Sequence, residues 1–159
     1  MDRGHQAPLG SFKGATDWRD TNFLSNITPQ FTKLNQGAWQ RLEAAIRALA
    51  IANPTGQLFV MTRPLYEWPM AKLPDTDKDH RVPSAYWKIV ALQDSTGAVT
   101  VAGFCFYQDT PKRANYCNHM RTVRFIEEKS GLDFFSEMPD PQEQAFETAQ
   151  PTLVAGLGC

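Results

Sequence analysis

A chain of 159 residues has the size of one domain and is long enough to bury a core. Its hydrophobic content of 42% and charged content of 21% are typical of a soluble globular protein and exclude a disordered chain. No apolar run approaches the roughly 20 residues that a membrane-spanning helix requires, so no membrane partner is expected. The net charge of -1 neither favours nor excludes nucleic acid, because a protein that must release it needs only a local basic patch.

The first third of the chain is expected to hold two short extended segments and one long helix. Residues 1–9 have the pattern of a strand end that runs into a loop. Residues 10–22 are rich in loop-forming residues, and residues 22–30 predict a short extended segment with turn chemistry. From residue 35 to residue 53, apolar side chains recur at helical spacing and predict a helix. The apolar stripe of that helix consists of Trp39, Leu42, Ile46 and Leu49.

The middle of the chain predicts an antiparallel sheet. Residues 57–62, 86–92 and 98–107 are rich in β-branched and aromatic side chains, as strands are. The turn Ser95-Thr96-Gly97 joins the last two strands and predicts a hairpin. Residues 63–84 contain several prolines and are expected to form an ordered surface loop.

The last quarter of the chain predicts only one regular element. A second, shorter helix fits residues 123–130, with Gly131 as its C-terminal stop. After Glu137 the chain is proline-rich and polar, and no further element is expected.

The three cysteines have different surroundings. Cys105 lies in a strand-like run and is expected to be a buried, unpaired thiol. Cys117 lies in a polar loop and Cys159 is the last residue, so they form either a disulfide or two free thiols. A bridge would close a loop of about 40 residues, contribute up to roughly 4 kcal/mol, and indicate an oxidising compartment.

Five polar residues near the N-terminus form a set suited to phosphodiester hydrolysis. His5 is the candidate general base, because imidazole exchanges protons near neutral pH. Asn35 offers a neutral oxygen of the kind that Mg²⁺ prefers, and Glu43 offers a carboxylate to the water shell of such an ion. Arg3 and Arg47 are candidates to bind the phosphate.

Helix geometry is compatible with this set but leaves simpler interpretations open. On a regular helix, Asn35, Glu43 and Arg47 lie within an arc of about 120° beside the apolar stripe. Glu43 and Arg47 are equally typical of an exposed ion pair, and Asn35 of a helix N-cap. Gly4 is expected to give the backbone the freedom to aim the His5 ring.

Three N-terminal motifs and several later blocks resemble the DNA/RNA non-specific endonucleases of the ββα-metal superfamily, over nearly the whole chain. The motifs are Asp2-Arg3-Gly4-His5-Gln6-Ala7-Pro8, Leu24-Ser25-Asn26-Ile27-Thr28-Pro29-Gln30 and Leu34-Asn35-Gln36-Gly37-Ala38-Trp39. The later blocks are Pro64-Leu65-Tyr66-Glu67, Pro83-Ser84-Ala85-Tyr86-Trp87-Lys88 and Thr110-Pro111-Lys112. The resemblance implies an α+β fold of the ββα-metal nuclease type, with an antiparallel sheet, a long active-site helix and a shorter second helix.

The same resemblance implies that residues 1–159 are a single nuclease domain, equivalent to the C-terminal two-thirds of the family domain. The family's N-terminal part, with strands of the central sheet and a further arginine, has no counterpart in this chain. Relatives tend to carry glycine at the position of Arg63. A left-handed backbone there would disfavour arginine, and the alternative is that the basic side chain contacts substrate.

The resemblance also implies a role for each candidate residue. His5 corresponds to the general base, Asn35 to the sole protein ligand of a hydrated Mg²⁺, and Glu43 to the carboxylate that orients the water shell of the ion. Mn²⁺ is an expected substitute. Arg3 and Arg47 correspond to phosphate-binding arginines and Asn26 to a supporting polar residue. Asp2 is expected to have a structural role.

The implied substrates are DNA and RNA, cleaved to 5′-phosphorylated products without sugar specificity. Cys117 and Cys159 correspond to a disulfide pair, which implies a secreted or periplasmic protein, although no signal peptide is visible in this chain. Family members often dimerise, so a homodimer is a further expectation. The alternative function is a catalytically inactive remnant or nucleic-acid-binding module that needs an N-terminal segment or a partner chain.

Overall fold

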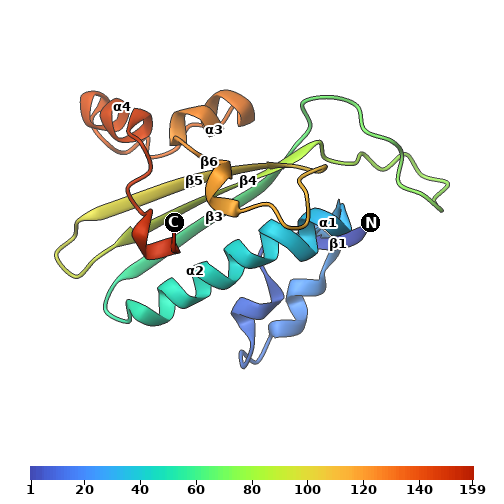
Figure 1. Cartoon of the computed structure of the whole chain (residues 1–159), viewed down its shortest axis with the longest axis horizontal. Helices are drawn as coiled ribbons and strands as arrows, with labels where there is room; N and C mark the ends of the chain where they lie inside the picture. The colour runs from blue at the N-terminus through green and yellow to red at the C-terminus, as the bar shows by residue number, and fades with distance from the viewer.

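A four-stranded antiparallel sheet, with strand order β3-β4-β5-β6, forms the centre of the computed structural model, which describes residues 1–159 (Figure 1). The strands are β3 (Gln57–Leu65), β4 (Ala85–Gln93), β5 (Val99–Tyr107) and β6 (Met120–Arg121). Helix α2 (Gln40–Ala52) covers one face, and α3 (Val123–Ser130) and α4 (Asp140–Thr148) cover the other (Figure 1). The predicted α+β class, antiparallel sheet and hairpin are confirmed.

Strand β4 is buried on both faces because successive side chains of a strand point to opposite sides of the sheet. Tyr86 and Val90 belong to the core under α2, whereas Trp87 and Ile89 belong to the core under α3. Lys88 lies between Tyr86 and Val90 in this alternation and therefore faces α2. It is fully buried. A lysine in this position requires partners, because burial of an unpaired ammonium group is costly.

A two-stranded ribbon holds the N-terminal motif. Strand β1 (Asp2–His5) pairs antiparallel with β2 (Ile27–Gln30). Both strands lie within the extended segments predicted for residues 1–9 and 22–30. Gly4 has a different purpose from the one expected: a Cβ atom there would lie 2.7 Å from the Cβ of Gln30 and 3.1 Å from the carbonyl oxygen of Thr28. The glycine allows the two strands to pack closely, and no unusual backbone angle is involved.

The helix that follows β2 is not regular. It begins with α1 (Thr32–Leu34), three residues earlier than predicted, and passes through a π-type turn (Asn35–Trp39) before α2. Gln36 (φ -88°, ψ 15°) and Gly37 (φ -121°, ψ -120°) depart from helical angles. Residue 112 packs against this turn, because a Cβ on Gly37 would lie 2.7 Å from the Lys112 carbonyl oxygen.

Two expectations for Asn35 are therefore wrong. Asn35 has helical angles inside the helix, and Phe31 is the N-cap residue of α1, so Asn35 is not an N-cap. The arc of about 120° on a regular helix does not apply either, because the distorted turn lies between Asn35 and Glu43.

Three further differences concern the sheet and the C-terminal part. β3 continues to Leu65, and Arg63 lies in it opposite Trp87. Arg63 is not among the residues with positive φ, so the backbone there does not disfavour arginine. Helix α4 was not predicted: Pro141 lies in its first turn, where a missing N–H has no intrahelical partner to lose. The shorter helix α3 is confirmed, and Gly131 ends it with a φ of 67°.

The C-terminal segment closes the core under α2. Leu153 and Leu157 are buried in that core, and the Tyr116 hydroxyl donates to the Leu157 carbonyl oxygen at 2.6 Å. Cys117 and Cys159 form a disulfide, and Cys105 is a buried free thiol, as predicted.

Strand β3 is an edge of the sheet with apolar side chains in solvent. Phe59 is 50% exposed and Val60 is 41% exposed, and Leu58 and Met61 beside them are partly exposed. Exposed apolar edges of this kind favour association. Separately, no helix of the protein is both long enough and apolar enough to cross a membrane.

Candidate active site

His5 lies on the ribbon with one ring nitrogen committed to the backbone. Its Nδ1 lies 3.1 Å from the carbonyl oxygen of Arg3, which can only accept a hydrogen bond. The proton of the neutral ring is therefore on Nδ1, and Nε2 carries the lone pair that can accept a proton. Nε2 lies 3.4 Å from the Oδ1 of Asn22, an oxygen that can accept a hydrogen bond once the ring is protonated.

Asp2 links the ribbon to the helix that carries Asn35. Its carboxylate accepts hydrogen bonds from Thr32 Oγ1 (2.7 Å), Asn35 Nδ2 (2.9 Å) and Gln36 Nε2 (3.0 Å). Burial alone would raise the pKa of Asp2, but these three hydrogen bonds together lower it below its usual range. Because the Asn35 amide group uses Nδ2 for Asp2, its Oδ1 is left without a hydrogen-bond partner in the chain and is available to a ligand.

Glu43 and Lys88 face each other across the space between α2 and the sheet. Burial raises the pKa of Glu43, whereas the positive charges of Lys88 and Arg47, and finally of His5, act in the opposite direction. The Lys88 ammonium donates to Thr62 Oγ1 at 2.6 Å and lies 4.4 Å from the centre of the Trp39 ring. Burial lowers the pKa of Lys88 to about 8, although the charge of Glu43 raises it.

A cavity of about 420 Å³ opens beside this pair. Glu43, Lys88 and Asn26 line it, together with Gln6 from the loop after His5. Asn26 uses all of its polar atoms to hold that loop: Nδ2 donates to the carbonyl oxygens of Ala7 (3.0 Å) and Thr21 (2.8 Å), and Oδ1 accepts from the Ala7 N–H (2.8 Å). Asn26 is thus placed to support the cavity wall.

The two candidate arginines lie in different surroundings. The Arg47 guanidinium packs against the turn that contains Gly10, where a Cβ would lie 3.2 Å from Nη1. Arg3 lies with His80 and Arg81 at a second hollow of about 490 Å³ and has no side-chain hydrogen bond or ion pair to the other candidates. Glu43 and Arg47 form no direct ion pair, so that interpretation of their spacing is wrong.

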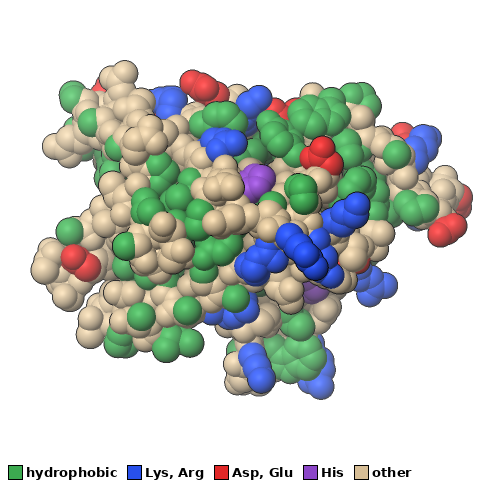
Figure 2. Space-filling model, in the orientation of Figure 1, with side chains coloured by type: hydrophobic (Ala, Val, Ile, Leu, Met, Phe, Trp, Pro, Cys, Tyr) green, Lys and Arg blue, Asp and Glu red, His purple; other side chains and the backbone are tan.

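Further positive charge lies along the neighbouring surface. Figure 2 shows Lys and Arg side chains gathered over the N-terminal end of α2. Arg41 and Lys112 are two exposed basic residues in this part of the protein. A hydrogen bond links them, because Arg41 Nη2 donates to the Lys112 carbonyl oxygen at 3.0 Å. This surface provides a local basic patch in a protein with a net charge of -1.

Sequence reasoning missed two residues of the site. Lys88 lies in an aromatic-rich strand, between positions 86 and 90, which both face the helix. Because side chains alternate along a strand, this spacing indicates that Lys88 also faces the helix rather than solvent, and it is buried there. Asn22 contacts His5 across 17 residues, and its position in a loop offered no comparable signal.

Lys88→Met is expected to raise the pKa of Glu43, because Lys88 is the strongest of the charges that lower it. Carbon-13 NMR titration of the Glu43 carboxyl group measures this shift. Lys129→Met, which removes a lysine paired with Glu67 on the opposite side of the sheet, should leave the Glu43 titration unchanged. An unchanged Glu43 titration in Lys88→Met would show that the two groups are not coupled.

The same variant should change how stability depends on pH. Between about pH 8 and 10.5 the unfolded chain holds the Lys88 proton that the folded protein has released. The contribution of Lys88 to the free energy of unfolding therefore rises with pH across this window and is lowest below it. Urea denaturation from pH 7 to 10 should show this rise in the parent relative to Lys88→Met, and parallel curves would contradict the lowered pKa.

Comparisons with known proteins match the chain to one family. The model of the DNA/RNA non-specific endonuclease family matches residues 1–141. The nuclease of Serratia marcescens is 44% identical over 159 residues, which is 100% of this chain and 60% of that protein. Mitochondrial endonuclease G of Bos taurus is 28% identical over 150 residues, 84% of this chain and 48% of that protein. The chain thus spans about half to three-fifths of the length of these relatives.

A solved structure shows the same fold. In a crystal structure of an EndoG/EndoGI complex, one chain superposes with a TM-score of 0.74, covering 89% of this chain and 61% of that one at 24% identity. The order β1, β2 and then the helix bearing Asn35 is the ββα unit, and the predicted ββα-metal nuclease fold is confirmed. The chain belongs to the DNA/RNA non-specific endonuclease family.

Proposed function

We propose that this chain is a Mg²⁺-dependent endonuclease that hydrolyses phosphodiester bonds of DNA and RNA, with His5 as the general base. The observation that carries the proposal is the Asp2 carboxylate, which ties the strand bearing His5 to the helix bearing Asn35. These hydrogen bonds hold β1, which carries the proton acceptor His5, beside the helix that carries the free Oδ1 of Asn35. The chain that holds this arrangement belongs to a nuclease family.

The donor groups fit a magnesium ion. Asn35 Oδ1 is an uncommitted neutral oxygen, and Glu43 is a carboxylate on the next turns of the same helix. Oxygen donors suit Mg²⁺, which keeps several waters and needs few protein ligands. Such an ion would polarise the phosphate and stabilise the charge of the leaving oxygen. Mn²⁺, a divalent ion that oxygen donors also suit, is expected to substitute.

His5 supplies the proton transfer. Nε2 accepts a proton from the attacking water, while the hydrogen bond from Nδ1 to the Arg3 carbonyl oxygen holds the ring in place. The imidazolium that forms can donate a hydrogen bond to Asn22 Oδ1, which lies 3.4 Å from Nε2. Attack at phosphorus with departure of the 3′ oxygen leaves a 5′-phosphate and a 3′-hydroxyl group.

Arg3 and Arg47 bind phosphate groups on either side of the scissile bond in this proposal. Arginine matches the geometry of phosphate, so both are proposed to contact the backbone rather than base edges. Backbone contacts position nucleic acid without reading its sequence, which accounts for cleavage of both DNA and RNA.

Asn35→Ala tests the metal assignment. Without the amide oxygen, half-maximal activity should require at least about tenfold more Mg²⁺, and activity at low Mg²⁺ should fall by a comparable factor. Gln36→Ala is the matched control, because Gln36 also donates to Asp2 but lies outside the proposed set of metal ligands. An Asn35→Ala protein with the Mg²⁺ response of the parent would remove Asn35 from the metal site.

The second candidate function is a nucleic-acid-binding module that needs another segment or partner chain for catalysis. The free edge of β3 favours it, because Phe59 and Val60 are exposed there beside an apolar hollow of about 650 Å³. The same edge supports self-association, as a homodimer requires. DNA binding without cleavage at any Mg²⁺ or Mn²⁺ concentration would favour this function, and light scattering measures the oligomeric state.

The disulfide supports a proposal on location. Disulfides persist in oxidising compartments and are rare in the cytosol. The Cys117–Cys159 bridge is therefore in keeping with a secreted or periplasmic protein.

A further inference from the structure

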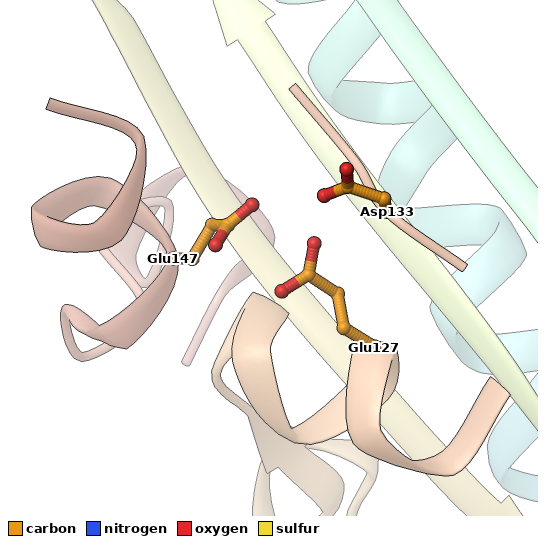
Figure 3. Close-up of side chains that lie close together, drawn as sticks. All are labelled: Glu127, Asp133 and Glu147. Atoms are coloured by element: carbon orange, nitrogen blue, oxygen red, sulfur yellow. The ribbon is translucent and has the colours of Figure 1, made fainter. Parts of the chain in front are cut away.

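An acidic cluster lies on the side of the sheet opposite α2. Glu127 comes from α3, Asp133 from the loop after it, and Glu147 from α4, and Figure 3 shows their carboxylates turned toward a common space. One ligand oxygen from each residue lies within 4.8 Å of the other two. The cluster is separate from the candidate active site, which lies between α2 and the sheet.

The buried members of the cluster are not fully satisfied by the protein. Glu147 is 1% exposed, and its Oε1 has no hydrogen-bond partner. Arg124 reaches Glu147 Oε2 at 2.6 Å and Glu127 Oε2 at 3.2 Å, so its guanidinium occupies only one side of the pair. A buried carboxylate oxygen without a partner is costly, and it points to a ligand that the protein itself does not provide.

Charge and access both suit a cation. Three carboxyl groups lie beside a single guanidinium, so acidic groups are in excess and a divalent cation would compensate them. Asp133 is exposed and makes no hydrogen bond or ion pair within the chain, so it opens the cluster to solvent. Glu143, one turn before Glu147 on α4, adds further negative charge and also has a buried oxygen without a partner.

We propose that Glu127, Asp133 and Glu147 bind one Ca²⁺ ion, which fastens α4 to α3. Calcium binds oxygens at about 2.3–2.6 Å, so two ligands on opposite sides of the ion lie up to about 5 Å apart. The three oxygens all lie within 4.8 Å of one another, so they can share one such ion. Water at the exposed Asp133 side completes the coordination.

Calorimetric titration of the EDTA-treated full chain with CaCl2 tests this site. One Ca²⁺ should bind per chain, and a saturating concentration should raise the Tm by about 3 °C or more. Asp133→Asn should abolish both effects and leave the cation-free Tm unchanged, because Asp133 has no partner in the chain to lose. Glu137→Gln, an equal change of charge in the same exposed loop, should bind as the parent does.

Two more variants separate the outcomes. Asn35→Ala should keep the Ca²⁺ response, so this site and the proposed nuclease metal site fail independently. Glu147→Gln should also lose the response, because the substitution removes a charged ligand oxygen from the proposed site. The absence of binding heat and of any Tm change up to about 10 mM CaCl2, or Asp133→Asn binding Ca²⁺ like the parent, would overturn the proposal.

Discussion

His5→Ala is expected to lower the turnover of DNA and RNA cleavage by a factor on the order of 10³–10⁴, which is the upper range for loss of a general base. Nε2 is the only proton acceptor on the ring once Nδ1 is bound to the Arg3 carbonyl oxygen, and alanine provides none. Nucleic-acid affinity should change little, because the phosphate contacts assigned to Arg3 and Arg47 remain.

Initial rates on a defined duplex, combined with fluorescence anisotropy for binding, measure both quantities. Added imidazole should restore part of the activity of His5→Ala, which a purely structural role would not allow. Asn22→Ala should lose far less turnover, because Asn22 only stabilises the protonated ring. A His5→Ala protein that cuts as fast as the parent would remove His5 from the mechanism.

Loss of the Cys117–Cys159 disulfide is expected to lower the free energy of unfolding by about 2–4 kcal/mol. The bridge spans 42 residues in sequence, and opening it increases the entropy of the unfolded chain. It also anchors the segment that places Leu153 and Leu157 in the core under α2. The reduced protein should therefore unfold at a lower urea concentration.

Urea denaturation of the parent with and without a reducing agent measures this contribution. The double variant Cys117→Ser, Cys159→Ser should match the reduced parent and should not respond to the reducing agent, since the remaining Cys105 is a buried free thiol. Equal stability of the oxidised and reduced parent would show that the bridge contributes nothing to folding.

Elements built from local patterns were predictable. The strands β4 and β5 and the helix α3 follow from runs of β-branched residues, a turn at residues 95–97 and the stop at Gly131. Helix α4 was not predicted because the chain after Glu137 is proline-rich and polar, although proline is tolerated in a first turn. In β4, β5 and α3 the local preference and the tertiary structure agree.

The active-site helix was harder because its distortion depends on a distant contact. The π-type turn at Gln36 and Gly37 accommodates the Lys112 backbone, 75 positions along the chain from Gly37. Nothing in the local sequence specifies that contact. The amphipathic stripe predicted α2 correctly, but the start at Thr32 and the true orientation of Asn35 follow from tertiary packing.

The residue types of the candidate site were predictable, but their partners were not. The identities of His5, Asn35 and Glu43 follow from the motifs, whereas the hydrogen bond from Asn35 to Asp2 joins residues 33 positions apart. The burial of Lys88 opposite Glu43 likewise appears only when β4 packs under α2. Non-local contacts of this kind determine how the site works, and a single sequence does not show them.

Cleavage of supercoiled plasmid and of RNA by the purified 159-residue chain, with Mg²⁺ and with EDTA, tests the central claim most directly. His5→Ala is assayed beside it as the control for contaminating nucleases. The site described here predicts that both substrates are cut only with Mg²⁺ and that the variant leaves them intact. A folded chain that binds nucleic acid but cuts neither substrate at any Mg²⁺ or Mn²⁺ concentration would contradict the claim and favour a binding module.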